Sequence, residues 1–109
     1  MNRKLSPFDL VCAPLFTLKG IEASTSYGTP AVKFKKTLLV RLREDGNAIV
    51  IRIDPADRDR LLRDRADVFF LTDHYIAYPY VLAHLRVLQA EELYALLEPI
   101  WRSLQPKRK

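Results

Sequence analysis

Apolar and polar residues alternate along residues 31–53, and this pattern constrains the fold more than any other feature of the chain. Val32 and Phe34 share one side of the first segment, whereas Lys33 and Lys35 share the other. A period of two indicates β-strands with a single apolar face. The stretch 44–47, Glu-Asp-Gly-Asn, predicts a hairpin turn between two such strands. We therefore expect an antiparallel meander that is covered on one side only.

The same alternation assigns side chains to the two faces of the predicted sheet. The inward-facing set is Leu38, Val40, Leu42, Ile49, Ile51 and Ile53. The outward-facing set is Leu39, Arg41, Arg43, Val50 and Arg52, together with Lys33 and Lys35. The outer face is thus predicted to be basic and to carry few aromatic residues, which disfavours a platform for stacking nucleobases.

Helices are predicted at both ends of the chain and between strands. Ser6 is a suitable N-cap with Pro7 at the first helical position, and Asp54 with Pro55 repeats this arrangement. A final helix is expected from Ala90, with leucines at helical spacing on one side. The order of elements predicts an α+β fold, in which the N- and C-terminal helices pack on one face of an antiparallel sheet.

The bulk composition limits the possible classes of protein. With 109 residues, of which 49% are hydrophobic and 28% charged, the chain is expected to form one globular domain, residues 1–109. No stretch approaches the ~18 apolar residues of a membrane span, and no secretory signal pattern is present, so we expect a cytoplasmic protein with no membrane partner. Cys12, the single cysteine, lies in an apolar run and is predicted to be buried and inert.

Cations collect in one acid-free stretch. Between Glu22 and Glu44 there are five Lys or Arg residues and no Asp or Glu, and the whole chain carries a formal charge of +5. Such a surface attracts polyanions, and each neutralised phosphate adds to affinity by releasing counterions. The predicted DNA-contacting residues are Lys33, Lys35, Lys36, Arg41, Arg43 and Arg52, with Lys107 and Arg108 of the basic tail. The alternative is that these cations only decorate a solvent-exposed sheet and protect it from aggregation.

A second cationic run is predicted to be self-neutralised. Its four arginines, in residues 58–65, alternate with aspartates, and Asp54 with Arg58 and Asp59 with Arg63 stand at i, i+4 spacing. We interpret this run as a solvated helix surface.

The cluster Asp73, His74 and Tyr75 is the most enzyme-like part of the chain. A His near a carboxylate can act as a general base, and Tyr78 and Tyr80 could help to line a pocket. No partner nucleophile, glycine-rich phosphate loop or metal-ligand spacing accompanies them, so we predict no enzyme, cofactor or metal site. The alternative function is a domain that binds a small ligand or a protein partner through this cluster and the segment Tyr78-Pro79-Tyr80.

Four motifs together resemble the MmcQ/YjbR family across nearly the whole chain. They are residues 22–34 with Ser-Tyr-Gly-Thr-Pro at their centre, residues 42–46, residues 72–82 with Asp-His-Tyr and Tyr-Pro, and Trp101 with residues 106–108. Tyr80 departs from the family pattern, in which Trp is commoner at this position.

The resemblance implies a frataxin-like (CyaY-like) α+β sandwich and a DNA-binding role. Frataxin-type iron binding is not carried over, because Asp9 is the one acidic residue between Ser6 and Lys19. The residues on the family's motif positions, and therefore candidates for a shared pocket, are Tyr27, Thr29, Asp73, His74, Tyr75 and Trp101, with Lys107 in the tail. Monomer and dimer remain equally open.

Overall fold

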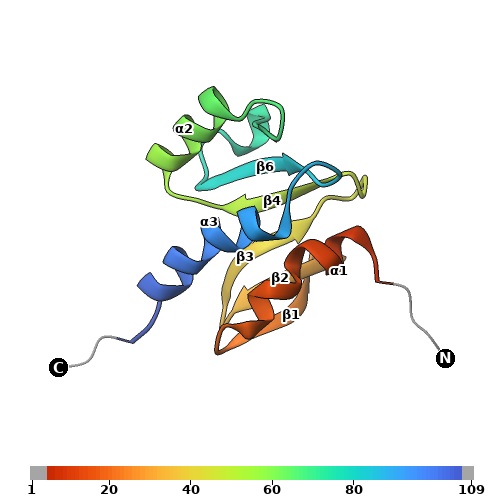
Figure 1. Ribbon diagram of the computed structural model, residues 1–109, viewed down its shortest axis with the longest axis vertical. Coiled ribbons are helices and arrows are strands. Elements are labelled where there is room, and N and C mark those ends of the chain that lie inside the picture. The colour runs from red at the N-terminus through yellow and green to blue at the C-terminus, as the bar shows by residue number, and fades with distance from the viewer. Residues whose placement is uncertain (1–4, 107–109) are drawn as a thin grey trace.

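The computed structural model describes residues 5–106 as a six-stranded antiparallel sheet with three α-helices (Figure 1). The strands lie in the order β1-β2-β3-β4-β6-β5, which confirms the predicted α+β class. The strands are β1 (Ile21–Ser26), β2 (Thr29–Phe34), β3 (Thr37–Leu42), β4 (Ala48–Arg52), β5 (Phe69–Phe70) and β6 (Tyr80–His84). The helices are α1 (Pro7–Cys12), α2 (Pro55–Asp64) and α3 (Ala90–Ser103), with short 3-10 helices η1 (Ala13–Thr17) and η2 (Asp73–Tyr75).

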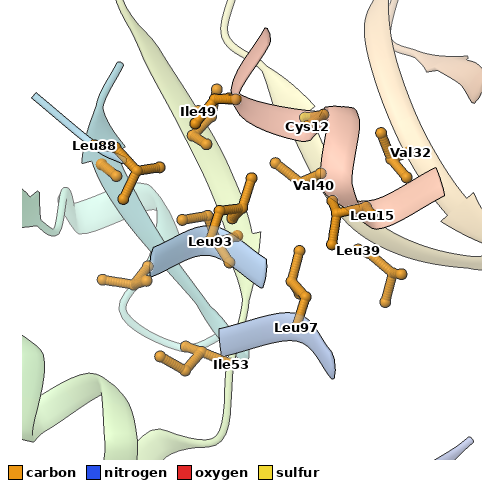
Figure 2. Packing of buried hydrophobic residues seen from close by; sticks show 14 of the residues in the cluster. Cys12, Leu15, Val32, Leu39, Val40, Ile49, Ile53, Leu88, Leu93 and Leu97 are labelled. Atoms are coloured by element: carbon orange, nitrogen blue, oxygen red, sulfur yellow. The ribbon is translucent and has the colours of Figure 1, made fainter. Parts of the chain in front are cut away.

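The two terminal helices pack on one face of the sheet, as predicted. Leu15 from η1 and Leu93 and Leu97 from α3 are fully buried against strand residues such as Val40 and Ile49 (Figure 2). Val40 and Ile51 are direct cross-strand partners, so the apolar row continues from strand to strand. This helix-covered layer is the main hydrophobic core of the protein.

Local chemistry at the N-terminus explains where the first helix begins and ends. Ser6 and Asp9 form a capping box, in which each side chain accepts a hydrogen bond from the other's backbone N–H at 3.1 Å. Pro14 lies where α1 gives way to η1. The chain then turns into β1 at Gly20, whose φ is +85° and where an added Cβ would lie 2.7 Å from the Phe34 ring. Only glycine fits this turn without displacing Phe34.

One predicted facing of side chains in β3 is wrong. Val32 pairs with Val40 but Lys33 pairs with Leu38, so Leu39 is an extra residue that forms a β-bulge. Leu39 is consequently buried in the helix-covered core, whereas Leu38 lies on the outer face beside Arg41. Because a bulge shifts the register by one residue, strict alternation assigned both leucines to the wrong face.

The prediction that only one face of the sheet is covered is also wrong. A row of cross-strand partners on the second face, Ala31, Arg41, Val50 and Leu82, is at most 6% exposed. The connection between β5 and β6, which contains η2, folds back over this outer face and brings the Tyr75 hydroxyl to the Arg41 guanidinium. A contact between residues so far apart in the chain is invisible to a local pattern.

Candidate functional site

A pocket of about 490 Å³ opens on the outer face of the sheet. Its lining comes from the β1–β2 turn, from β3 and β4, and from the segment that contains η2 and the start of β6. The lining residues are Ser26, Tyr27, Leu38, Arg41, Glu44, Val50, His74, Tyr75, Tyr78 and Tyr80. Four tyrosines therefore gather on a face that was predicted to carry few aromatic residues, because three of them arrive on the β5–β6 connection and β6.

Arg41 lies at the bottom of this pocket and is 6% exposed. Its Nη2 donates to the Tyr75 hydroxyl at 2.7 Å, a short charge-assisted hydrogen bond. Its Nη1 donates at 3.4 Å to Thr29 Oγ1 and at 3.3 Å to the Leu42 carbonyl oxygen. The guanidinium thus joins β2, β3 and η2, and it supplies a cation to an otherwise largely aromatic cavity.

Glu44 forms a loose ion pair with this cation. Its Oε2 lies 3.6 Å from Arg41 Nη1, beyond ordinary hydrogen-bond length, and its side chain is 66% exposed. The carboxylate occupies the position of a counter-ion that an incoming anion can replace. Although Arg41 is buried, the carboxylate is mostly in water and lies too far away for a hydrogen bond, so we expect an incoming anion to displace Glu44 at little cost.

Aromatic rings form a connected wall above the strands. The His74 and Tyr75 rings meet edge to face with centroids 4.7 Å apart, and Tyr75 meets Tyr80 in the same manner at 6.1 Å. Tyr78 lies on the other side of His74, at 6.2 Å. The separations and angles are those of favourable aromatic pairs, so the rings support one another.

Tyr27 closes the opposite side of the pocket from an unusual backbone position. Tyr27 and Gly28 form the two-residue β1–β2 turn, with φ values of +53° and +79°. Turns of this type favour Asn-Gly, and a bulky residue with positive φ is strained. Tyr27 is 85% exposed, and its ring centroid lies 5.3 Å from the Arg41 Cζ, within cation–π range. The turn thus places a largely solvent-exposed aromatic ring beside the pocket cation.

Arg58 of α2 holds the tyrosine segment in place. Its Nη1 donates to the carbonyl oxygens of Tyr78 at 2.8 Å and Tyr80 at 3.4 Å. Its buried Nε has no hydrogen-bond partner among the described residues, although Asp59 Oδ1 lies 4.0 Å away. The sequence predicted a solvated Arg58 paired with Asp54, and this is wrong because the side chain reaches the folded-back segment instead. Other arginines of α2 have closer acidic neighbours, for example Arg60 with Asp57 at 3.0 Å.

The predicted DNA-contacting residues divide into two groups. Arg41 is buried, and Arg52 donates to the Leu38 carbonyl oxygen at 2.8 Å and the Tyr80 hydroxyl at 3.3 Å. Arg43 lies 3.9 Å from Asp45. These three guanidinium groups have protein partners on neighbouring strands, in the β3–β4 turn and in the folded-back segment. Lys35 and Lys36 are exposed at the β2–β3 turn, and Lys33, near the end of β2, is half-buried. Lys107 and Arg108 lie outside the described residues.

The residues of the family resemblance are only partly brought together. Tyr27, His74 and Tyr75 line the pocket, and Thr29 contacts Arg41 beneath it. Asp73 is exposed at the start of η2 and does not line the pocket. Trp101 lies in the helix-covered layer, where its Nε1 donates to the Lys19 carbonyl oxygen at 2.8 Å and its ring packs on the core. Its place on α3 separates it from the pocket by the sheet.

Four pocket residues were not singled out as site candidates from the sequence: Ser26, Leu38, Glu44 and Val50. They carry no motif and enter the site only through strand register and the turn. Arg58 was missed as a positioning residue for the same reason. One local signal was present, however, since Tyr before Gly28 stands at a position where a two-residue hairpin turn favours Asn, which indicates an unusual turn residue.

Clusters of metal-ligating side chains and membrane-spanning helices are absent from the described part of the chain. Within residues 5–106 no three metal-ligating side chains converge on one point, and no helix is both long and apolar enough to cross a bilayer. Cys12 is buried, as predicted, and burial, with a smaller effect of the Asp9 charge, raises the pKa of its thiol to about 12. No family model matches the chain, and no curated protein shows significant sequence similarity to it.

Proposed function

We propose that this protein is a non-enzymatic binding module, and that its ligand is a small anion that enters the outer-face pocket. The observation that carries the proposal is the Arg41 guanidinium at the bottom of a cavity of about 490 Å³. Pockets for small molecules typically have volumes of ~300–1,000 Å³ and combine apolar walls with a few well-placed polar groups. This pocket has apolar and aromatic walls and one buried cation.

Hydrogen-bond donors remain for such an anion. The guanidinium has five N–H groups, and three bonds to Tyr75, Thr29 and Leu42 use part of them. Because the Tyr75 hydroxyl accepts from Arg41, its own proton is free to be donated into the pocket. The anion replaces Glu44, whose carboxylate is only loosely paired.

The test is binding of a chemically diverse fragment library followed by NMR of the ¹⁵N-labelled protein. We expect anionic fragments to shift the amide signals of residues 26–27, 41 and 74–80, and His74→Ala or Tyr75→Phe to weaken these shifts. Lys35→Glu, on the exposed β2–β3 turn, is the matched control and should leave them unchanged. The proposal fails if fragments from all classes leave the pocket signals unmoved.

A second function is favoured by one observation, the exposed Lys35 and Lys36 at the β2–β3 turn with the half-buried Lys33 near the end of β2. We propose DNA binding through their contacts with phosphates, together with membership of the MmcQ/YjbR family and a CyaY-like fold. Terminal helices that share one face of the sheet support that fold. Three phosphate contacts would make log affinity fall with log salt at a slope of about −3.

Fluorescence anisotropy with a labelled mixed-sequence duplex tests this second function. Wild type should bind at low salt and lose affinity as salt rises, whereas Lys33→Glu/Lys35→Glu should not bind. The variant avoids Arg41, whose replacement would disturb the structure itself. An affinity that is independent of salt, or an unaffected double variant, would remove the phosphate mechanism.

A further inference from the structure

We propose that the outer-face pocket selects ligands that combine a planar aromatic ring with a single anionic group. This inference rests on the proposed function and narrows it from small anions in general to aromatic compounds that carry one anionic group, such as an aryl carboxylate or a phosphate attached to an aromatic group. It follows from three features of the pocket: the placement of Tyr27, the free ring surface opposite it, and the number of cations.

Tyr27 is held where a ring can cover a ligand. Tyr27 is 85% exposed and projects from a two-residue turn whose backbone suits Asn better than Tyr. Among residues 5–106 its ring makes one aromatic or cationic contact, with Arg41, at 5.3 Å. A ligand ring that lies against Tyr27 would bury aromatic surface that is now in water and would stack in the offset manner that aromatic pairs prefer.

The facing wall also presents ring surface. Tyr78 is 54% exposed, although His74 lies beside it, and Tyr75 and Tyr80 continue the wall towards the strands. The bottom between the two walls is apolar where Leu38 and Val50 line it. A planar aromatic ring, with tyrosines against both of its faces, matches this space better than a flexible aliphatic chain, which would leave the tyrosine rings poorly packed.

The charges of the pocket specify one anionic group. Arg41 is the one Lys or Arg among the lining residues and Glu44 the one carboxylate, so displacement of Glu44 exposes a single positive charge. Arg41 and the Tyr75 hydroxyl stand 2.7 Å apart and can donate to the same anion. Both a carboxylate and a phosphate accept such donors, and the experiment must separate them.

Isothermal titration calorimetry with matched ligands tests the inference. The first set is 2-naphthoate, its neutral analogue 2-naphthamide, and the non-aromatic anion cyclohexanecarboxylate. We expect 2-naphthoate to bind about tenfold more tightly than either comparison compound, since one lacks the charge and the other the ring. The second set, adenosine 5′-monophosphate and adenosine, shows whether a phosphate serves as the anion.

Three variants should change ligand affinity in a pattern that binding to a nonspecific apolar site would not produce. Tyr27→Asn keeps the turn, and should weaken 2-naphthoate about tenfold while changing cyclohexanecarboxylate little. Glu44→Gln removes the competing carboxylate and should strengthen binding of 2-naphthoate a few-fold. Asp45→Asn is its control in the same turn, because Asp45 lies near Arg43 rather than Arg41 and Asn retains an oxygen for the Asn47 amide.

The outcomes separate this inference from the proposed function. Equal affinities for 2-naphthoate and 2-naphthamide, or for 2-naphthoate and cyclohexanecarboxylate, would overturn the inference that the pocket requires both a ring and an anionic group. The proposed function would still stand in that case if the NMR signals of the pocket residues shift when anions are added. Absence of shifts in the pocket signals with every compound would overturn both. Unchanged affinity in Tyr27→Asn would also contradict the inference, because the ring would then have no part in binding.

Discussion

The hydrogen bond between Arg41 and Tyr75 should be the principal link between the sheet and the segment that forms the pocket. It joins β3 to η2 across 34 positions of the chain, at 2.7 Å, from a guanidinium that is 6% exposed. We expect that the two side chains stabilise the fold cooperatively. A double-mutant cycle with Arg41→Met and Tyr75→Phe isolates their interaction, because each change removes the bond and keeps most of the side-chain volume.

The magnitude follows from the geometry. A hydrogen bond to a charged group contributes ~1.5–3 kcal/mol to the free energy of unfolding, and the short, buried bond here belongs in that range. Tyr75→Phe alone should cost about 2–3 kcal/mol, since it removes this bond and also leaves a guanidinium N–H without its partner. Arg41→Met should cost slightly more, because the longer bonds to Thr29 and Leu42 are lost as well. The coupling energy should therefore be about 1.5 kcal/mol.

Urea denaturation followed by circular dichroism measures these free energies, provided that the four proteins unfold with equal m-values. Arg52→Met with Tyr80→Phe is a matched control cycle, because the same pair of groups meets at 3.3 Å in a half-buried setting. Its coupling should stay below ~1 kcal/mol. A coupling energy under ~0.5 kcal/mol for Arg41 and Tyr75 would refute the argument that this bond holds the pocket wall to the sheet.

Three further predictions follow from burial and from the positioning contacts. Leu97→Ala should lower the free energy of unfolding by ~2–5 kcal/mol because Leu97 is fully buried, whereas Leu10→Ala, at a residue 56% exposed, should change it by less than ~0.5 kcal/mol in the same urea titration. Folding raises the pKa of the Cys12 thiol from 9.0 to about 12, so the thiol loses its proton at lower pH in the unfolded chain than in the folded one. Between pH 9 and 12 the free energy of unfolding of the wild type should therefore fall by ~1.4 kcal/mol per pH unit relative to that of Cys12→Ala. Parallel pH dependences of the two free energies would contradict this. Arg58→Ala should speed hydrogen exchange of the Ile53 amide, which donates to the Pro79 carbonyl oxygen at 2.9 Å. The surface variant Arg60→Ala is the control and should leave this exchange rate unchanged. Equal exchange rates in the two variants would show that Arg58 does not position the segment.

Much of the secondary structure could be predicted because its determinants are local. Ser6 and Pro7 start α1, and the Glu-Asp-Gly-Asn stretch 44–47 separates β3 from β4. The alternation correctly placed Val40 in the helix-covered layer. The β-bulge at Leu39 could not be predicted in this way, since the extra residue is defined by the pairing with β2 and not by the residues around it.

The candidate site was predictable in its parts but not in its assembly. His74, Tyr75, Tyr78 and Tyr80 stood out as an aromatic cluster, and Arg41 stood out as a cation, but the sequence assigned them to separate surfaces. The structure places the cluster over the cation, which turns a predicted phosphate contact into the bottom of a pocket. Likewise, Trp101 shares a motif set with Tyr27 in the sequence and yet lies on the other side of the sheet.

The sequence by itself determined the α+β class, most helix and strand positions, and the burial of Cys12, because caps, turns and apolar periodicity act over a few neighbouring residues. Only the tertiary structure decided that both faces of the sheet are covered, that Arg41 is buried, and that four tyrosines enclose it. The physical reason is that these outcomes depend on contacts between residues far apart in the chain, such as Arg41 with Tyr75 and Arg58 with Tyr78, and such contacts form only when the segment between β5 and β6 folds back across the sheet.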